Sequence, residues 1–354
     1  MNGFTKFLAG IFSLLLLLVT PLQASDLPDP DGKPADLSKP VKVFILMGQS
    51  NMLGAGKVNG EKDGTLEYAV HKENLYPFLI DDSGNWTERK DVRNVFVMGS
   101  GGPDSKPRVR KNEFMTIKGG KIGPEIGIGH HLGNLYEQPV LILKSCIGNR
   151  SLGWDLLPPG SKSFEFDAKD KQTKEMKTWT YAGYKQSPNR WEKGTTPKKI
   201  GWYAGMQYDG DIARAKQVLE NLNDYYPGAE SYEVVGFFWW QGDKDRYDPG
   251  HTSRYETNLV NLVNALRKDF NAPEAKFVCA TLGQTKKGSQ SPDGRILDAM
   301  FALENYPELK GDTATVYSHP LSLGGASNSH YGGNAKTYMN VGLGMGEAMV
   351  DLLK

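Results

Sequence analysis

Short apolar runs alternate with segments of helical periodicity along the chain. Runs rich in β-branched and aromatic residues are typical of buried strands. These strand-like runs lie at residues 41–47, 139–145, 232–240, 276–282 and 313–318. In the segments between and after them, apolar residues recur every three or four positions, as on one face of a helix. The helices expected from this spacing span residues 123–136, 210–225, 252–270, 294–304 and 334–353.

Strands that alternate with helices form parallel sheets through crossover connections. Five such strands predict an α/β fold, a flavodoxin-like three-layer α/β/α sandwich with a mostly parallel five-stranded sheet. Residues 92–98 alternate apolar and polar side chains, which predicts a half-exposed extra strand, antiparallel to its neighbour, near the functional edge of the sheet. Neither a repeat nor a linker is apparent, so residues 26–354 are expected to form a single domain.

Residues 155–208 differ from the rest of the predicted domain. They are rich in Lys, Pro, Gly, Thr and aromatic residues and show no sustained period. A long irregular insert in a compact domain is usually functional or disordered, and disordered segments are poor in aromatic residues. We therefore expect an ordered lid or rim whose aromatic faces suit sugar rings. The alternative is that the rings only pin the insert to the body.

The first 25 residues have the pattern of a secretory signal peptide. Lys6 precedes an almost unbroken apolar run from Leu8 to Val19, and small or polar residues follow through Ser25. The run is too short for a comfortable membrane span. We expect a secreted or periplasmic protein, with a retained N-terminal anchor as the alternative and no other segment suited to a membrane.

Charge and cysteine content exclude several classes of function. The net charge of +1 argues against nucleic acid as a partner. Cys146 and Cys279 lie in apolar runs, where buried free thiols are commoner than a disulfide, although an exported protein can form one. No histidine pattern beside them indicates a metal site. The basic stretch 102–121 is interpreted as a solvated loop, with an anionic ligand as the alternative, and oligomeric state stays undetermined.

The strand-like run 41–47 ends in the turn Gly48-Gln49-Ser50-Asn51-Met52. Ligands of open α/β sheets bind at the carboxyl ends of the strands, so Ser50 would stand at the mouth of a crevice. Its hydroxyl can act as a nucleophile, and its own N–H can help to bind an oxyanion. The alternative is an ordinary turn, because Ser and Asn are common turn residues.

Three later turns carry polar residues at the same edge of the predicted sheet. Gly148-Asn149 can supply a main-chain donor to an oxyanion. Gln241 can supply a side-chain donor there, or it can pin a loop. His330 follows the last strand, where it can accept the proton of a serine and return it to the leaving group. Nucleophile, oxyanion donors and base would then converge on one crevice.

Together these motifs resemble the SGNH-hydrolase superfamily, in particular its sialate O-acetylesterase and carbohydrate esterase family six branch. The resemblance covers nearly the whole chain after residue 25 and rests on Gly48-Gln49-Ser50-Asn51-Met52 with Gly54 and Gly56, Gly123-Pro124-Glu125, the block Lys144 to Leu152, Trp239-Trp240-Gln241-Gly242-Asp243, and His330. It implies the SGNH hydrolase fold and a serine esterase that removes O-acetyl groups from sugars without metal or cofactor. Ser50 becomes the nucleophile and His330 the base. The implied oxyanion and substrate group comprises the N–H of Ser50, Gln49, Gly148, Asn149 and Gln241.

The chain departs from the family pattern beside the histidine. The family commonly has an acid three residues before it, whereas here that residue is Ser327, and no carboxylate occurs from 314 to 346. Either a hydroxyl or a carbonyl group orients His330 in a Ser-His dyad, or Asp243 or Asp245 supplies the acid. Loss of activity is the remaining outcome.

Two further positions bear on the site. Asn149 stands where the family usually has a glycine, and Asn tolerates left-handed backbone better than most residues. The turn is therefore expected to survive, and the Asn149 side chain can enter the oxyanion hole. Glu125 follows a proline at an expected helix start, where it favours the positive end of the helix dipole, so we do not assign it as the missing acid.

These observations predict an esterase acting on acetylated oligo- or polysaccharide, of the acetyl-xylan or sialate type, through an acetyl-enzyme on Ser50. One alternative is a non-catalytic carbohydrate-binding protein on the same scaffold, because Ser327 replaces the acid and the insert is rich in aromatic residues. A lipase or thioesterase would need an apolar acyl channel, and the polar insert argues against one.

Overall fold

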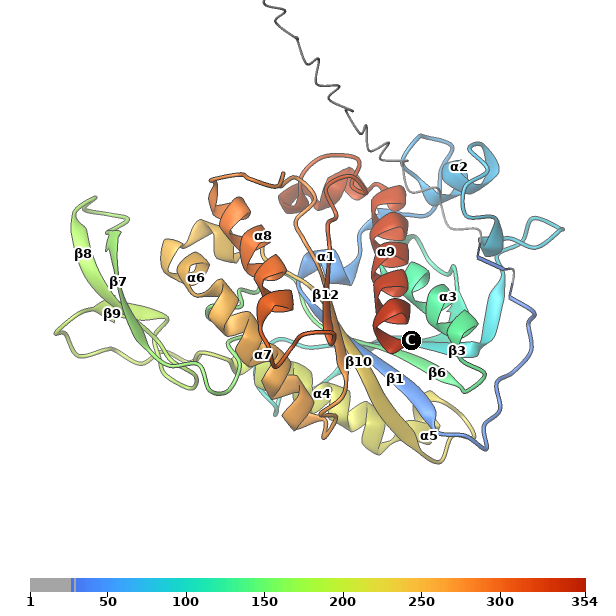
Figure 1. The fold of residues 1–354 in the computed structure, drawn as a ribbon, viewed down its shortest axis with the longest axis horizontal. Helices are drawn as coiled ribbons and strands as arrows, with labels where there is room; N and C mark the ends of the chain where they lie inside the picture. The colour runs from blue at the N-terminus through green and yellow to red at the C-terminus, as the bar shows by residue number, and fades with distance from the viewer. Residues whose placement is uncertain (1–26, 29) are drawn as a thin grey trace, which may run out of the picture.

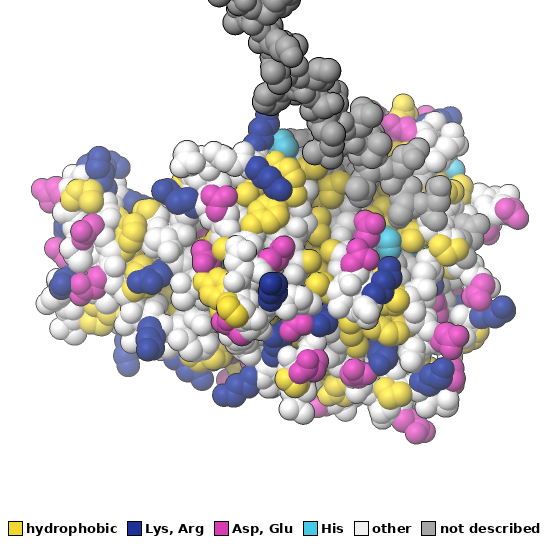
Figure 2. Space-filling model, in the orientation of Figure 1, with side chains coloured by type: hydrophobic (Ala, Val, Ile, Leu, Met, Phe, Trp, Pro, Cys, Tyr) yellow, Lys and Arg dark blue, Asp and Glu magenta, His cyan; other side chains and the backbone are white. Residues whose placement is uncertain are grey.

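The computed structural model of the chain describes residues 27, 28 and 30–354. The predicted signal peptide, residues 1–25, lies outside the described residues. Within the described part, no helix combines the length and the apolar character that crossing a bilayer requires. Charges of both signs are interspersed over the face seen in Figure 2, in keeping with the net charge of +1.

A large sheet lies at the centre of the fold (Figure 1). Its seven strands follow the spatial order β12 (Thr313–Val316), β11 (Lys276–Ala280), β10 (Tyr232–Trp240), β1 (Val41–Gly48), β6 (Val140–Ser145), β3 (Glu88–Met98) and β4 (Arg108–Thr116). Every neighbouring pair is parallel except β3 and β4. The mostly parallel α/β class is therefore confirmed, whereas the expected number of five strands is wrong.

The two additional strands correct the predictions for residues 92–98 and 102–121. β3 is an internal strand, parallel to β6 on one side and antiparallel to β4 on the other. It is more buried than its alternating pattern indicated, because β4 and helices cover it. Part of the basic stretch interpreted as a loop forms β4, whose residues are mostly exposed or half-buried. Charged side chains on such an edge strand discourage pairing with another chain.

Helices cover both faces of the sheet (Figure 1). One face carries α2 (Leu66–His71), α3 (Glu125–Leu135) and α9 (Ala335–Leu353). The other carries α4 (Met206–Glu220), α7 (Tyr255–Asp269) and α8 (Pro292–Ala302). The short elements are α1 (Ser50–Leu53), β2 (Gly56–Lys57), η1 (Pro77–Leu79), β5 (Lys121–Ile122), α5 (Leu222–Tyr225), η2 (Asp245–Tyr247), α6 (Pro249–Ser253), η3 (Leu303–Asn305) and η4 (Ser327–Gly333). All five expected helices are present, in three layers with the sheet between.

The insert at 155–208 is more regular than its sequence indicated. It contains a three-stranded antiparallel sheet of β7 (Phe164–Lys169), β8 (Met176–Tyr181) and β9 (Arg190–Glu192). Figure 1 shows this sheet projecting from the body beside α6. The Tyr181 hydroxyl donates to Asp248 Oδ1 at 2.7 Å and ties the insert to the start of α6. At least this aromatic residue therefore pins the insert to the body.

The two cysteines, Cys146 and Cys279, are both buried and free, as the sequence led us to expect. Burial raises the pKa of the Cys279 thiol to about 12 and that of the Cys146 thiol still further. Both thiols therefore stay protonated near neutral pH. No group of three or more His, Cys, Asp or Glu side chains suited to a metal ion occurs in the described ranges.

Helices α3 and α9 cross at very short range. A Cβ atom added to Gly342 of α9 would lie 2.3 Å from the carbonyl oxygen of Pro124, so only glycine fits this position. Close approach of two helix backbones fixes the start of α3 relative to the sheet. Glu125, the first residue of α3, is thereby held beside β6.

Glu125 forms a buried ion pair with Lys144 of β6, with Nζ and Oε2 2.5 Å apart. Burial opposes the charged form of Glu125, but the ammonium groups of Lys144 and Lys111 and the hydrogen bonds to the carboxylate together outweigh it and hold the pKa of this carboxyl below its ordinary value. Glu125 also accepts from the Gly123 N–H at 3.1 Å. Lys144 donates to the Leu53 carbonyl oxygen at 3.2 Å. The pair therefore joins the start of α3, β6 and the last residue of α1.

We expect Lys144→Met to lower the free energy of unfolding by about 3–5 kcal/mol, because it leaves the Glu125 carboxylate buried without a counter-charge. The double variant Lys144→Met/Glu125→Leu should recover much of this loss. Denaturant titration measures both. The half-exposed Lys177–Glu192 pair is the control, where Lys177→Met should change stability by less than about 1 kcal/mol. Equal losses in the single and double variants would contradict this account of the pair.

Candidate active site

The turns that follow the central strands meet at one edge of the sheet. β1 leads into α1 with Ser50, β6 into the turn with Gly148, and β10 into Gln241, while η4 with His330 follows β12. A Cβ atom on Gly148 would lie 3.7 Å from Ser50 Cβ, so these two turns are in contact. The Gln241 amide nitrogen lies 3.1 Å from Gln49 Oε1, next to Ser50. The segments predicted to converge are thus neighbours in the structure.

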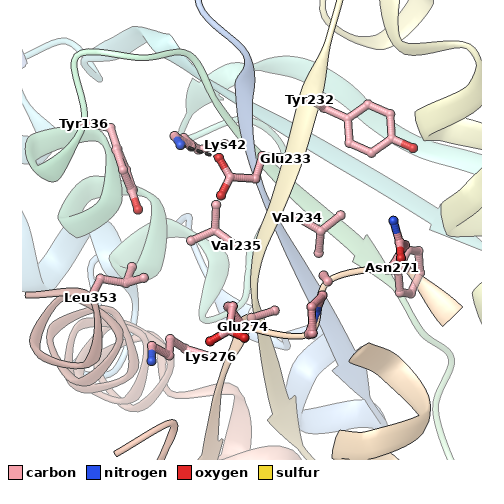
Figure 3. Close-up of a pocket in the computed structure, with 14 residues that line it drawn as sticks. Lys42, Tyr136, Tyr232, Glu233, Val234, Val235, Asn271, Glu274, Lys276 and Leu353 are labelled. Carbon is pink, nitrogen blue, oxygen red and sulfur yellow. Dashed lines mark hydrogen bonds and ion pairs between the residues drawn. The ribbon is translucent and has the colours of Figure 1, made fainter. Parts of the chain in front are cut away.

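A cavity lies at the opposite edge of the sheet, away from these turns. It encloses about 690 Å³ near the start of β1, β10 and β11 (Figure 3). The Lys42–Glu233 ion pair lies in its wall, with Nζ and Oε2 2.5 Å apart. None of the predicted catalytic residues lines it, so its size alone does not mark it as the active site.

Ser50 is the first residue of α1 and is half-buried. Its position follows from the sheet: the Gln49 N–H donates to the Trp240 carbonyl oxygen at 3.3 Å. Gly48 has φ of 146°, and a Cβ there would lie 2.5 Å from the same carbonyl oxygen, so this turn requires glycine. Within the described residues the Ser50 hydroxyl has no hydrogen-bond partner, which leaves it free to react.

The two turns that meet at Ser50 carry main-chain N–H groups without acceptors in the described part of the chain. Asn149 has φ of 59°, so it takes the left-handed conformation expected for an asparagine in place of glycine. Among the residues that the structure describes, the N–H groups of Ser50, Gly148 and Asn149 donate to no other group. Free N–H groups beside a nucleophile are what an oxyanion needs. These three are the candidate oxyanion donors.

Gln241, predicted as an oxyanion donor or a loop-pinning amide, lies at the centre of a buried hydrogen-bond network. Its side chain is fully buried, and its amide nitrogen lies 2.5 Å from Asp245 Oδ2, 2.9 Å from the Arg150 carbonyl oxygen and 3.1 Å from Gln49 Oε1. Its Oε1 accepts from the Tyr255 hydroxyl at 2.9 Å. A primary amide has two N–H groups, so none remains for an oxyanion in this geometry. These contacts fit the alternative in which Gln241 pins a loop, and Gln49 is one of its partners.

Asp245 completes this buried network. Its carboxylate accepts from the main-chain N–H groups of Leu152 at 2.9 Å and Gly153 at 2.7 Å, in addition to Gln241. Burial raises the pKa of Asp245 above its ordinary value, and these hydrogen bonds oppose the rise. Its oxygens hold the turn after β6, and within the described residues no hydrogen bond joins Asp245 to His330.

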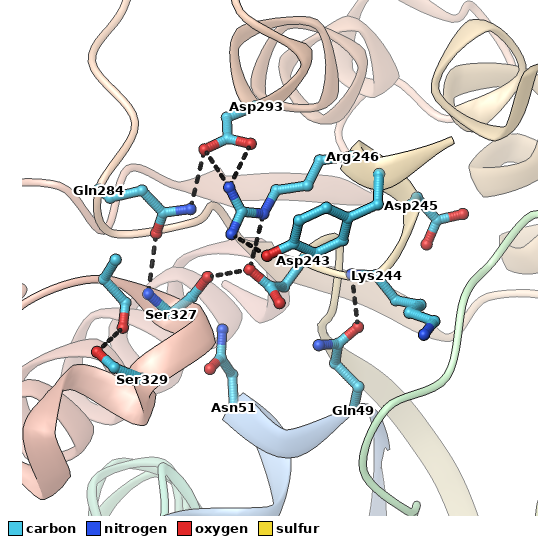
Figure 4. Close-up of polar contacts among 12 residues, drawn as sticks. Gln49, Asn51, Asp243, Lys244, Asp245, Arg246, Gln284, Asp293, Ser327 and Ser329 are labelled. Carbon is cyan, nitrogen blue, oxygen red and sulfur yellow. Dashed lines mark hydrogen bonds and ion pairs between the residues drawn. The ribbon is translucent and has the colours of Figure 1, made fainter. Parts of the chain in front are cut away.

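Asp243 lies toward the histidine loop instead (Figure 4). The Ser327 hydroxyl donates to Asp243 Oδ1 at 2.7 Å, and Arg246 Nε donates to the same oxygen at 2.9 Å. Ser327 stands where the resemblance places an acid. Position 327 itself has no carboxylate, but the carboxylate of Asp243 is hydrogen-bonded to it.

The loop η4 is tied to α1 by a residue that the sequence did not single out. The buried Tyr331 hydroxyl lies 3.4 Å from Asn51 Nδ2 and accepts from the Gly283 N–H at 3.2 Å. Its ring stacks on Trp240 with the centroids 5.8 Å apart. The position of Asn51, next to Ser50 in the motif, was the one signal for this contact.

His330 itself lies on the outer side of this loop. His330, Tyr331 and Gly332 have φ of 52°, 53° and 62°, so three consecutive residues are left-handed. The His330 ring is exposed and forms no hydrogen bond within the described part of the chain. The structure thus places His330 on the loop beside α1 but does not join its ring to Ser50 or to Asp243.

Comparison with known proteins gives one informative match. Residues 181–351, just under half of the chain, match the family model "Carbohydrate esterase, sialic acid-specific acetylesterase". The matched segment runs from the end of β8 into α9 and contains Gln241, Asp243 and His330, whereas Ser50 precedes it. No curated protein sequence matches the chain.

Several solved structures resemble the fold at low identity. A protein from Arabidopsis thaliana is 16% identical over 88% of this chain and 98% of its own, with a TM-score of 0.47. A carbohydrate acetylesterase from Xanthomonas citri is 13% identical over 87% and 55%, with a TM-score of 0.47. NanS is 14% identical over 80% and 78%, with a TM-score of 0.42. Because these likenesses are weak, the comparison rests on the family model: residues 181–351 are similar to the sialic acid-specific acetylesterases among the carbohydrate esterases, which supports a carboxylic ester hydrolase.

Proposed function

We propose that the protein removes O-acetyl groups from acetylated oligo- or polysaccharide through an acetyl-enzyme on Ser50, on a fold of the SGNH hydrolase type. The observation that carries this proposal is the free Ser50 hydroxyl at the carboxyl edge of the sheet, in contact with the Gly148 turn. The match of residues 181–351 to a carbohydrate esterase family model supports an enzyme over a non-catalytic sugar-binding protein. The proposed substrates are of the acetyl-xylan or the sialate type. We also propose that the protein is secreted or periplasmic.

In the proposed first step, Ser50 Oγ attacks the acetyl carbonyl while His330 accepts the hydroxyl proton. The negative charge that develops on the carbonyl oxygen is stabilised by the N–H groups of Ser50, Gly148 and Asn149. The sugar hydroxyl leaves with the proton from His330. Water then hydrolyses the acetyl-enzyme, with His330 again as the base.

Closure of the His330 ring onto Ser50 accompanies substrate binding in this mechanism. Catalytic hydrogen bonds are commonly long or misaligned before substrate binds, and here the ring is exposed on a left-handed loop. Asp243 holds Ser327 at the start of this loop. Its negative charge also favours the positively charged imidazolium that forms when His330 takes the proton.

The assignment of Ser50 is tested with Ser50→Ala. Since the variant has no nucleophile, we expect turnover of p-nitrophenyl acetate and acetyl-xylan to fall by at least about a thousandfold. A fluorophosphonate should label the wild-type protein and not the variant. Ser83→Ala, on an exposed loop, is the matched control and should behave as wild type. Wild-type turnover in Ser50→Ala would show that the nucleophile lies elsewhere.

The role of Asp243 is tested by removing its carboxylate and placing one at position 327 instead. Asp243→Asn should reduce kcat by up to the roughly hundredfold or more that general acid–base catalysis contributes, since the loop of His330 loses its anchor at Ser327 and the charge that favours the imidazolium. In this background, Ser327→Asp restores a carboxylate at the family position and should recover part of the loss. The pH profile of kcat follows both variants. An unchanged kcat in Asp243→Asn would favour the dyad without a carboxylate.

The bracing role of Gln241 makes a separate prediction. Gln241→Ala removes one hydrogen-bond donor from the buried Asp245 carboxylate. We therefore expect the free energy of unfolding to fall by about 1–3 kcal/mol, together with a lower kcat. Thermal unfolding and steady-state kinetics measure the two effects. A large loss of kcat with unchanged stability would return Gln241 to the oxyanion hole.

A further inference from the structure

A second cavity, of about 280 Å³, lies beside the turn that carries Ser50. Leu53, the last residue of α1, lines this cavity, and its Cδ1 lies 3.4 Å from where a Cβ on Gly148 would be. Leu53 therefore contacts the candidate oxyanion turn and the cavity at once. It follows Ser50 by roughly 5 Å along α1, so a group in the cavity is a near neighbour of the reacting ester.

Asn94 of β3 lines this cavity and is an unusual residue for its position. It is fully buried, and within the described part of the chain neither its Oδ1 nor its Nδ2 has a hydrogen-bond partner. A buried amide without partners destabilises a protein by about 1–3 kcal/mol for each unmet group. An apolar side chain would avoid this loss, so the amide points to a polar ligand.

The remaining polar side chains of the lining are mainly basic. They comprise Arg110, Lys111, Lys121 and Lys144, against the single acid Glu125. Glu125 pairs with Lys144, and Lys111 lies 3.1 Å from Glu113. Arg110 and Lys121 form no ion pair with any described residue and are exposed. Two cations thus remain uncompensated above a buried amide, which favours an anion.

We propose that this cavity binds an anionic group of the glycan, a carboxylate or a sulfate ester, while the acetyl ester lies at Ser50. This inference rests on the proposed function and deepens it, because it assigns the substrate to the acidic glycans. Arg110 can bind an oxyanion through two parallel N–H groups, and Lys121 adds a second charge. The Asn94 amide, which has no partner within the described residues, is the donor in the cavity wall for the same group.

The test compares acetylated methyl pyranosides that differ only in charge. The three substrates are acetylated methyl glucoside, its 6-sulfate ester and acetylated methyl glucuronoside, with p-nitrophenyl acetate as the reference ester. We expect wild-type kcat/KM to be at least about tenfold higher for a charged sugar than for the neutral one, which corresponds to about 1.4 kcal/mol. Comparison of the two charged sugars distinguishes carboxylate from sulfate.

The variants assign this preference to the cavity. Asn94→Leu and Arg110→Ala/Lys121→Ala should lose the preference for charged sugars and keep wild-type turnover of p-nitrophenyl acetate. Asn94→Asp matches Asn94 in size and should favour the neutral sugar. This variant replaces Asn94→Leu in the test if the latter does not fold. Lys118→Ala removes a charge from the same basic stretch outside the cavity lining, so it should retain the preference.

Equal wild-type kcat/KM on charged and neutral sugars would overturn the proposal, as would a preference that survives in the cavity variants. Failure of the proposed function has a different signature. In that case the wild-type protein would hydrolyse none of the esters, including p-nitrophenyl acetate, or Ser50→Ala would remain active.

Discussion

The hydrogen bond between Gln241 and Asp245, at 2.5 Å in a fully buried site, organises the active-site edge. Gln241 is also hydrogen-bonded to Gln49 in the turn after β1, and Asp245 accepts from the Leu152 N–H in the turn after β6. Three parallel strands end at these turns, and each turn would otherwise leave main-chain groups without partners. A polar network inside a protein is stabilising only when its members are satisfied together. The network therefore fixes the turns that carry the proposed nucleophile and oxyanion donors.

The histidine loop is held at two points. Its start is anchored by Ser327 on Asp243, and Tyr331 packs under it against Trp240. His330 lies between these anchors, exposed and in left-handed backbone. In the proposed mechanism the base lies on a surface loop opposite the nucleophile, and its ring closes after the sugar has entered.

The fold was predictable where burial produces a regular pattern. The five core strands and five helices follow from apolar spacing, because a buried strand or helix face needs apolar residues at fixed intervals. β4 was missed because Arg108–Thr116 lies at an edge, where most of its residues are exposed or half-buried and need not alternate. The small sheet of the insert was missed for a similar reason, since β7 and β8 are largely exposed or half-buried.

The sequence by itself determined which residues stand at the ends of the parallel strands, and thereby that Ser50, Gly148, Gln241 and Asp243 would be neighbours. Only the tertiary structure decided what each of them does. Gln241 became a brace because of partners such as Gln49, 192 residues away, and Asp243 reached the histidine loop through Ser327, 84 residues away. Apolar periodicity records local burial, whereas the role of a buried polar group depends on which distant donors and acceptors the fold brings to it.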